Sequence, residues 1–376
     1  MSMGLRPLCA VVMAAGEGSR MRSSLPKPLH AVCGRPILLH VLDALSELLV
    51  DRAVVVVGWG AERVTKTLLE HGPPDLPIDF VEQRAQRGTG DAVSVALTAF
   101  PDDDEDGDLI VLPGDTPLVR PSTLGGLVAE HRSGDAAATL LTARLDDPTG
   151  FGRVIRGKDG RVSHIVEELD ATEAERVVDE VGTSIYCFRR SVLAPALRRL
   201  SPENAQGEYY LTDVVAVLSQ VGYPVAAVTV DDPTEALGVN DRQQLAVAET
   251  ELRRRINRRW MKAGVAMTDP DHTYVDASVQ LGTDVTLLPG TMLQGRTVVG
   301  SGARLGPDVR LVDCAVGEGA SVEMSVGYDA EVGPHAVVGP YAVLRPGSHV
   351  VPGATTGPFY TASANEDEGP ERAKRD

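Results

Sequence analysis

The sequence predicts an α/β protein in two parts: a Rossmann-like, doubly wound domain, followed by a short left-handed parallel β-helix of hexapeptide repeats. Apolar runs alternate with helical patterns in the first half, and aliphatic residues recur at intervals of six in the last third. Hydrophobic residues make up 43% of the chain but aromatic residues only 4%. That composition suits interiors packed by Val, Leu and Ala, as in parallel sheets and stacked repeats.

The first half alternates strands with helices. Residues 8–13 form an apolar run that ends in glycines, and residues 37–49 carry a helical pattern. A second strand is expected over 53–57, a second helix over 61–70 and a further strand over 109–112. This alternation predicts a parallel, doubly wound sheet. The acidic run 101–108 is expected to be a solvated surface turn rather than a metal site.

The last third carries a six-residue repeat. Its aliphatic positions are Val275, Leu281, Leu287, Leu293, Val299, Leu305 and Leu311, and after slips in phase Val316, Val322, Val326, Val332, Val338, Leu344 and Val350. Small or β-branched residues stand four positions later, at Val279, Val285, Thr291, Thr297, Ala303, Val309 and Ala315. Three hexads form one triangular turn of a parallel β-helix, so these 14 hexads predict between four and five turns.

Domain boundaries follow from these patterns. We predict a nucleotide-binding domain over residues 1–232, a linker helix over 233–263, the β-helix over 264–358 and a disordered polar tail over 359–376. The linker helix carries Arg253, Arg254, Arg255, Arg258 and Arg259. They are interpreted as its solvated face; a nucleic-acid patch is the weaker alternative, because the chain is acidic overall.

Charge and cysteine content restrict the function and the compartment. The formal net charge of −17 argues against a general affinity for nucleic acid or anionic membranes. The four cysteines lie far apart without C-x-x-C spacing, which predicts neither a zinc site nor a disulfide framework. No membrane-spanning or cleavable signal pattern is recognised near the start, so we expect a soluble, cytoplasmic protein.

A glycine-rich loop follows the first strand, with Gly16 and Gly18 preceding Arg20 and then Lys27. Backbone N–H groups and two cations can converge there on a phosphate chain. A dinucleotide-binding fingerprint would place a glycine at Met21 and an acidic residue after the second strand, where the chain has Gly58. A Walker loop would need G-K-S/T, which is absent. The loop alone remains a weak signal.

Seven further motifs make the sequence resemble the bacterial bifunctional UDP-N-acetylglucosamine pyrophosphorylase/glucosamine-1-phosphate N-acetyltransferase family, from about residue 8 to about 357. They are LPKPLH (25–30), QRGTGDA (86–92), GD-x-P (114–117), GFGR (150–153), IVEELDAT (165–172), NAQGEYYLTD (204–213) and GVN (238–240). The resemblance implies attack of a sugar-1-phosphate oxygen on the α-phosphorus of UTP, with release of pyrophosphate. Partners are therefore UTP and a sugar-1-phosphate, with Mg²⁺ as cofactor and a homotrimer formed through the β-helix.

The resemblance also assigns residues to roles. Arg20 and Lys27 match the catalytic positions that contact the reacting phosphates. The nucleotide-binding set is Ala14, Ala15, Gly16, Gly18, Gln86, Gly88 and Thr89, with Gln86 and the Gly88 turn expected at the uracil. Gly152 and Glu167 match sugar-binding positions, and Asp115 and Asn240 match the Mg²⁺ ligands. Two bland alternatives stay open: Asp115 as a helix cap and Glu167 as a surface charge.

Two departures from the family pattern affect these expectations. Where the family has Asn-Thr-Gly, this chain has Gly182-Thr183-Ser184, so one sugar-contacting amide is missing. The family's β-helix continues well beyond the L-R-P-G segment at 344–347 and carries the acetyltransferase residues there, whereas this chain has about 30 further residues. His335 and His349 do not match acetyltransferase positions and are interpreted as coil-turn residues. Acetyl transfer is expected to be absent.

Three other functions stay open on the sequence. Another hexose-1-phosphate, for example glucose-1-phosphate, could replace N-acetylglucosamine-1-phosphate, because Gly182 removes a discriminating group. The chain could also be a scaffold subunit with a decayed catalytic domain, although Arg20, Lys27, Asp115 and Asn240 are all present. An acetyltransferase with an appended nucleotide domain is disfavoured by the short repeat.

Overall fold

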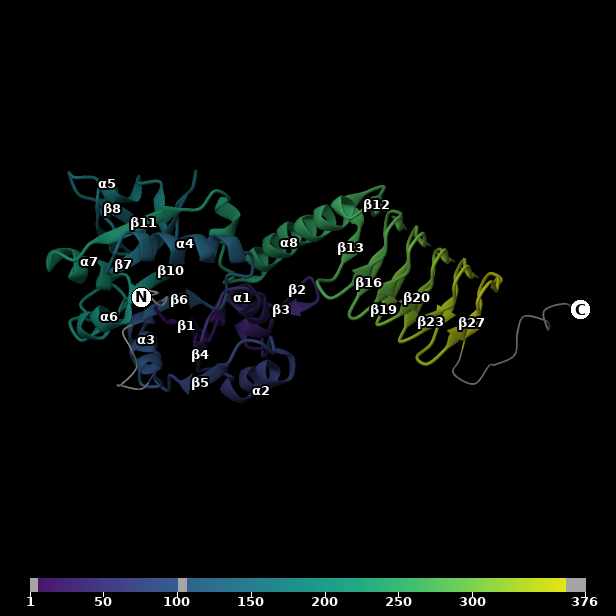
Figure 1. Ribbon diagram of the computed structural model, residues 1–376, viewed down its shortest axis with the longest axis horizontal. Helices are drawn as coiled ribbons and strands as arrows, with labels where there is room; N and C mark the ends of the chain where they lie inside the picture. Colours follow the sequence, from purple (N-terminus) through teal and green to yellow (C-terminus); the bar gives the residue numbers. More distant parts are fainter. Residues whose placement is uncertain (1–5, 101–106, 363–376) are drawn as a thin grey trace, which may run out of the picture. The chain divides into compact units, whose positions relative to one another are not determined.

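The computed structural model describes residues 6–100 and 107–362, whose contacts divide the chain into two units. Unit 1 comprises Met1–His30 and Pro36–Ala248, and unit 2 comprises Ala31–Arg35 and Glu249–Asp376 (Figure 1). Most of the predicted acidic turn (101–106) and the polar tail from 363 lie outside the described residues. Asp108, placed in that turn by the sequence, instead begins a strand and is only 1% exposed.

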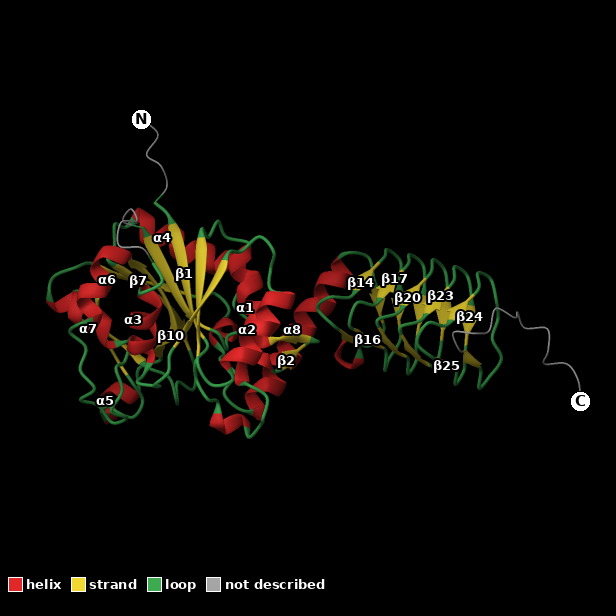
Figure 2. Cartoon of the chain, turned by 90° about the horizontal axis from the view of Figure 1, so that it is seen from below, coloured by secondary structure: helices red, strands yellow, loops and turns green. Residues whose placement is uncertain are grey.

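Unit 1 is built on one sheet with the central order β11-β7-β10-β6-β1-β4-β5 (Figure 2). Its strands are β1 (Leu8–Met13), β4 (Arg52–Val57), β5 (Ile78–Glu82), β6 (Asp108–Pro113), β7 (Ala138–Arg144), β10 (Glu180–Arg189) and β11 (Val225–Thr229). A hairpin of β8 (Arg153–Arg156) and β9 (Val162–Val166) attaches to β10. The strands expected over 8–13, 53–57 and 109–112 are present within one residue of their predicted bounds.

The sheet differs from the prediction in one strand direction. β1 is parallel to both β4 and β6, but β10 runs antiparallel to β6 and β7. A parallel return needs a crossover that covers the sheet, normally a helix. Between β7 and β10 the chain instead forms the β8–β9 hairpin and the four-residue helix α5 (Glu173–Arg176), so β10 enters from the opposite end.

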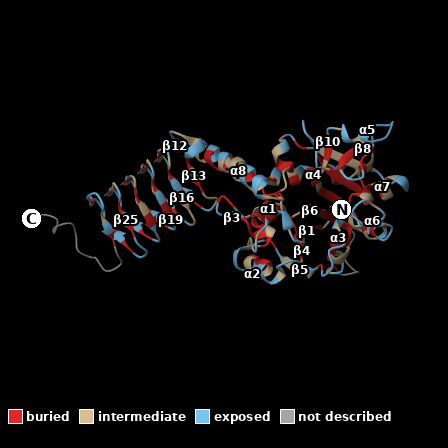
Figure 3. Cartoon of the chain, turned by 180° about the vertical axis from the view of Figure 1, so that it is seen from behind, coloured by how far each residue is buried: buried red, intermediate tan, exposed pale blue. Residues whose placement is uncertain are grey.

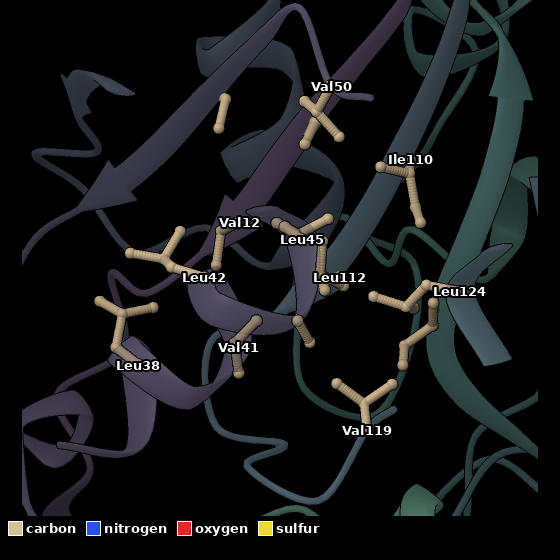
Figure 4. Packing of buried hydrophobic residues seen from close by; sticks show 14 of the residues in the cluster. Val12, Leu38, Val41, Leu42, Leu45, Val50, Ile110, Leu112, Val119 and Leu124 are labelled. Carbon is tan, nitrogen blue, oxygen red and sulfur yellow. The ribbon is translucent and has the colours of Figure 1, made fainter. Parts of the chain in front are cut away.

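Helices contribute to a hydrophobic core on each face of this sheet, and Figure 4 shows part of the core that contains Val12 and Leu42. On one face lie α1 (Ile37–Ser46), α2 (Ala61–His71) and α4 (Pro121–Ser133), and on the other α3 (Thr89–Leu97), α6 (Arg190–Leu197) and α7 (Asp213–Gln220). Alternate residues of a strand face opposite sides. Val12 therefore packs with Leu42 of α1, while Val11 packs with Val93 of α3. Figure 3 shows the central strands as buried.

The remaining short elements of unit 1 are 3-10 turns: η1 (Ser19–Met21), η2 (Lys27–Leu29) and η3 (Pro233–Ala236). The long helix α8 (Arg242–Lys262) begins in unit 1 and ends in unit 2. It is followed by η4 (Pro270–His272), and the hairpin strands β2 (Ala31–Val32) and β3 (Arg35–Pro36) pair with each other. Among the described residues, no helix has the length and apolar character of a membrane span.

Unit 2 is the predicted β-helix, and its described strands form three parallel sheets of five, six and five strands. The first sheet contains β12 (Ala266–Met267), β15 (Thr286–Leu287), β18 (Arg304–Leu305), β21 (Ser321–Val322) and β24 (Val337–Val338). The second contains β13 (Tyr274–Val275), β16 (Met292–Gln294), β19 (Arg310–Val312), β22 (Val326–Tyr328), β25 (Val343–Leu344) and β27 (Thr361–Ala362). The third contains β14 (Gln280–Leu281), β17 (Val298–Val299), β20 (Ala315–Val316), β23 (Glu331–Val332) and β26 (His349–Val350). β27 extends the repeat past the boundary predicted at 358.

The predicted phase of the repeat is wrong at two positions. Val326 pairs with the exposed Arg310, and it is Gly327 that takes the buried position beside Leu311. Similarly, Ala315 is exposed and Cys314, 2% exposed, fills the interior. Two sides between β19 and β22 span five residues instead of six, from Leu311 to Val316 and from Val322 to Gly327, so the inward position shifts by one at each. A Cβ on Gly327 would lie 2.9 Å from Leu311 Cδ2, and only glycine fits without rearrangement.

Candidate functional site

A cavity of about 660 Å³ in unit 1 lies at the carboxyl ends of β1 and β6, a position where parallel sheets commonly bind ligands. Most predicted site residues line it: Ala14, Ala15, Gly16, Arg20, Lys27, Gln86, Gly88, Thr89, Asp115, Gly152, Glu167 and Asn240. Gly18 is the exception. The cavity thus brings together residues that lie up to 226 positions apart in the chain, from Ala14 to Asn240.

Gly18 acts behind the cavity wall instead of lining it. Its φ is +65°, in the left-handed region, and a Cβ there would lie 2.7 Å from Lys27 Cβ. Glycine therefore lets the loop pass directly against the stem of Lys27. Glu17 is exposed and does not line the cavity, as expected for a negative charge beside a predicted phosphate site.

Lys27, Asp115 and Asn240 meet at one point. The Lys27 ammonium donates to Oδ2 of Asp115 and, at 3.2 Å, to Oδ1 of Asn240. The side chains of Lys27 and Asp115 are 15% and 19% exposed. A carboxylate and an amide oxygen that already converge on one ammonium also fit a divalent cation with oxygen preference. No cluster of three or more His, Cys, Asp or Glu occurs among the described residues, so such a cation would need further oxygens from a ligand or water.

The backbone holds these groups in place. Gly114 N–H donates to Met13 O at 2.9 Å, which fixes the turn after β6 against the end of β1. Asp115 O accepts from Val239 N–H at 2.8 Å, joining that turn to the one that carries Asn240. Arg242 then donates to Met21 O at 3.2 Å, and so reaches the segment that leads to Lys27. The meeting point of Lys27, Asp115 and Asn240 is therefore assembled from three separate segments.

His30 completes this connection. Its Nδ1 lies 3.2 Å from Nη1 of Arg242, and its side chain is buried. Burial and the neighbouring guanidinium lower the pKa of His30, which favours the neutral ring that can accept this hydrogen bond.

The turn over 88–90 is fixed by the segment 204–213. Gly88 has φ +106°, and a Cβ there would lie 2.6 Å from Tyr209 O. Gly90 N–H donates to Tyr209 O at 2.8 Å, and Leu211 N–H donates to Thr89 Oγ1 at 3.0 Å. The predicted Gln86 donates to Ala15 O at 2.9 Å, which joins this turn to the glycine-rich loop. Two motifs far apart in sequence therefore build one end of the cavity.

Gln83 is a cavity residue that the sequence analysis missed. It is 5% exposed and its amide donates to Gly88 O at 3.1 Å and to Asp91 Oδ2 at 2.8 Å. Arg87 binds the other oxygen of Asp91 at 2.6 Å. The position of Gln83 directly after β5, at the carboxyl edge of a parallel sheet, was the signal that could have identified it as a site residue. Other lining residues not singled out as site residues include Thr149, Gly150, Phe151, Thr183, Ser184, Glu208 and Gln244.

Glu167 lies on the cavity wall as a half-buried carboxylate, so the alternative of a free surface charge is not supported. Burial raises the pKa of Glu167, the nearby Asp213 and Asp170 raise it further, and the Thr212 hydroxyl, donating at 2.9 Å, partly opposes them. A Cβ on Gly152 would lie 3.4 Å from Glu167 Oε2 and 2.9 Å from Ile165. Glycine at 152 therefore leaves this carboxylate accessible.

Comparison with known proteins decides the family. Residues 10–221 match the family described as MobA-like NTP transferase domain. The chain is 46% identical over 327 residues to the bifunctional protein GlmU of Thermobifida fusca (strain YX), which covers 86% of this chain and 67% of that protein. The GlmU of Desulfitobacterium hafniense (strain Y51) is 46% identical over 321 residues, covering 85% and 69%. That of Mycolicibacterium vanbaalenii is 45% identical over 327 residues, covering 87% and 66%.

The chain belongs to the GlmU family. This finding confirms the predicted family, and the enzyme is a sugar-1-phosphate uridylyltransferase. Its chain spans about two thirds of the length of these GlmU relatives. The predicted α/β domain and β-helix are both present.

This GlmU-family enzyme keeps an open space where the family pattern leads us to expect an amide. Gly182 lines the cavity, and a Cβ there would meet its nearest neighbour, Ile165 Cδ1, at 3.5 Å. Ser184, also on the cavity wall, has φ +61° inside an irregular stretch of β10. In the β-helix, His335 lies in a turn as predicted, but His349 is in strand β26, 3.2 Å from Glu331 of the neighbouring coil.

Proposed function

We propose that this uridylyltransferase forms UDP-N-acetylglucosamine and pyrophosphate from UTP and N-acetylglucosamine-1-phosphate. A phosphate oxygen of the sugar phosphate forms a bond to the α-phosphorus of UTP. The bond from that phosphorus to the bridging oxygen of the β-phosphate breaks, and its electron pair leaves with pyrophosphate. The observation that carries the proposal is the single cavity that Lys27, Asp115, Asn240 and Glu167 all line.

Charge neutralisation is the main task of the protein in this reaction. Two phosphate groups about 4 Å apart repel by roughly 4 kcal/mol for each pair of unit charges at an effective dielectric near 20. We assign this work to Arg20 and Lys27, with backbone N–H groups of the loop at Gly16. Asp115 and Asn240 would hold Mg²⁺, which supplies further positive charge at the phosphates when bound.

Other residues of the cavity wall bind the rest of the substrates in this proposal. Gln86, Gly88 and Thr89, with Ala14 and Ala15, would hold the nucleotide, and the hydrogen bonds of Gln86 to Ala15 and of Leu211 to Thr89 favour a preformed site. Gly152 and Glu167 would contact the sugar, with the carboxylate accepting hydrogen bonds from its hydroxyl groups.

A panel of nucleotides and sugar phosphates, assayed by pyrophosphate release, tests the substrates. The highest kcat/KM is expected for UTP with N-acetylglucosamine-1-phosphate, and no release with any UTP pair would sink the proposal. The space at Gly182 favours a second candidate, another hexose-1-phosphate such as glucose-1-phosphate, and the same panel separates the two. An Asp115→Ala variant that keeps full activity would instead show that the proposed metal site is wrong.

Three further expectations belong to this proposal. We expect no acetyl transfer by this chain, tested by calorimetry with acetyl-CoA. We expect a homotrimer through the β-helix, whose outward residues include the exposed Val298, Val337 and Val351, and light scattering measures its mass. We expect a cytoplasmic enzyme, because the four cysteines are buried and lie far apart in the sequence without C-x-x-C spacing.

A further inference from the structure

The loop over residues 149–152 lines the cavity next to Glu167, and its backbone is held from behind by two side chains. Arg153 donates from Nη1 to Phe151 O and from Nη2 to Glu168 Oε2 at 2.7 Å. Glu168 Oε2 also accepts from Gly150 N–H at 3.1 Å. One ion pair, between the buried Arg153 and the partly exposed Glu168, therefore binds two successive parts of the loop, Gly150 and Phe151.

Neither Arg153 nor Glu168 lines the cavity. The Arg153 side chain is 2% exposed, so its charge is almost removed from water and depends on these partners. Arg153 pairs in register with Val166, the last residue of β9, directly before Glu167 and Glu168. The two adjacent carboxylates therefore differ in their contacts: Glu167 lines the cavity, and Glu168 contacts Arg153.

The loop is also held at Gly152 and Phe151, because Gly182 N–H donates to Gly152 O at 2.9 Å and Phe151 N–H donates to Pro148 O at 3.2 Å. The Gly150 end depends on Glu168. Gly150 has φ +86°, and a Cβ built on it would meet no atom within 4 Å. The hydrogen bonds of Arg153 and Gly150 lower the pKa of Glu168, consistent with a carboxylate that stays ionised as their acceptor. By contrast, the residues proposed for the nucleotide are held by Ala15, Tyr209 and Leu211, on other segments.

We propose that Arg153 and Glu168 are positioning residues that set the sugar-phosphate subsite without touching the substrate. The inference rests on the proposed function, in which Gly152 and Glu167 contact the sugar. Releasing Gly150 and Phe151 should shift the loop beside Gly152 and Glu167, and misplacement of about 1 Å in such a site costs up to about a hundredfold in rate. The residues proposed for the nucleotide should be unaffected, so the two substrates should respond differently.

Glu168→Gln is the test, with Glu180→Gln as the matched control. Glu180 is a buried carboxylate that accepts hydrogen bonds from Nε and Nη2 of Arg156, at 2.8 and 2.6 Å. Arg156 lies on β8, the strand that also carries Arg153, but Glu180 neither contacts the loop nor lines the cavity. For Glu168→Gln we expect the KM of the sugar phosphate to rise roughly tenfold, with the KM of UTP unchanged. The control should leave both KM values unchanged. Equal changes in both KM values, or the same change in the control, would overturn the positioning role.

Hydrogen exchange of the Gly150 amide supplies a readout that does not depend on activity. The amide should exchange at least tenfold faster in Glu168→Gln than in the unmodified enzyme and in Glu180→Gln, since only the first variant weakens its acceptor. Unchanged exchange would refute the inference even if the enzyme proved inactive with every sugar phosphate. Faster exchange together with inactivity of the unmodified enzyme would leave the loop anchor supported and contradict the proposed substrates instead.

Discussion

Lys27 occupies the point where Asp115 and Asn240 converge, so we predict that Lys27→Met lets the free enzyme bind Mn²⁺ more tightly. A divalent cation about 4 Å from an ammonium is repelled by about 8 kcal/mol at an effective dielectric near 20. Lys27 must therefore leave before a cation enters. Leaving breaks its charged hydrogen bonds to Asp115 and Asn240, at a cost of about 2 kcal/mol. Removing this cost should strengthen Mn²⁺ binding roughly thirtyfold.

Electron paramagnetic resonance of free Mn²⁺ measures this affinity directly, without nucleotide and without turnover. Lys66→Met serves as the control, because Lys66 is 74% exposed on α2 and pairs with Glu70 at 3.9 Å. Asp115→Ala should abolish binding in every background. If Lys27→Met binds Mn²⁺ no more tightly than Lys66→Met, the ammonium does not block the cation position and the reasoning fails. Lys27→Met should also lose most uridylyl transfer, because Lys27 is proposed to neutralise the phosphates.

Three more predictions follow from buried or strained groups. Burial tends to raise the pKa of Asp108, but hydrogen bonds from His131 and Arg132 outweigh burial and lower it. The ionised Asp108 therefore stabilises the fold at pH values above the ordinary pKa of aspartate, and this stabilisation is lost as the pH falls below that pKa. Asp108→Asn should cost about 3 kcal/mol in urea unfolding at pH 7 and weaken that pH dependence. Because the pKa of Glu167 is raised, the KM for sugar phosphate should increase as the pH falls, beginning at pH values above the ordinary pKa of glutamate. A Glu167→Gln variant whose KM still rises in the same way would contradict this prediction. Gly18→Ala should lower the free energy of unfolding by about 1–2 kcal/mol and reduce kcat, because the added Cβ meets Lys27; an active, equally stable variant would argue against that contact.

Several site residues were predictable from the sequence because they belong to recognisable motifs. Gly16, Lys27, Asp115 and Glu167 were expected from local patterns and the family resemblance, and the structure places all four on one cavity. Gln83 was not expected, because the sequence analysis did not predict the strand β5 that precedes it. The role of the adjacent Glu168 was equally hidden, because only the fold reveals that it contacts Arg153 instead of the cavity.

The sequence by itself determined the elements whose cause is local. A six-residue period specifies a β-helix because each hexad forms one side, and continuous apolar runs specify the buried strands β1, β4 and β6. Tertiary structure decided what depends on distant partners: the reversed direction of β10, the shift of the buried position from Val326 to Gly327, and the meeting of Lys27 with Asn240. Those features depend on which surfaces remain to be covered once the chain packs, and no local pattern encodes that.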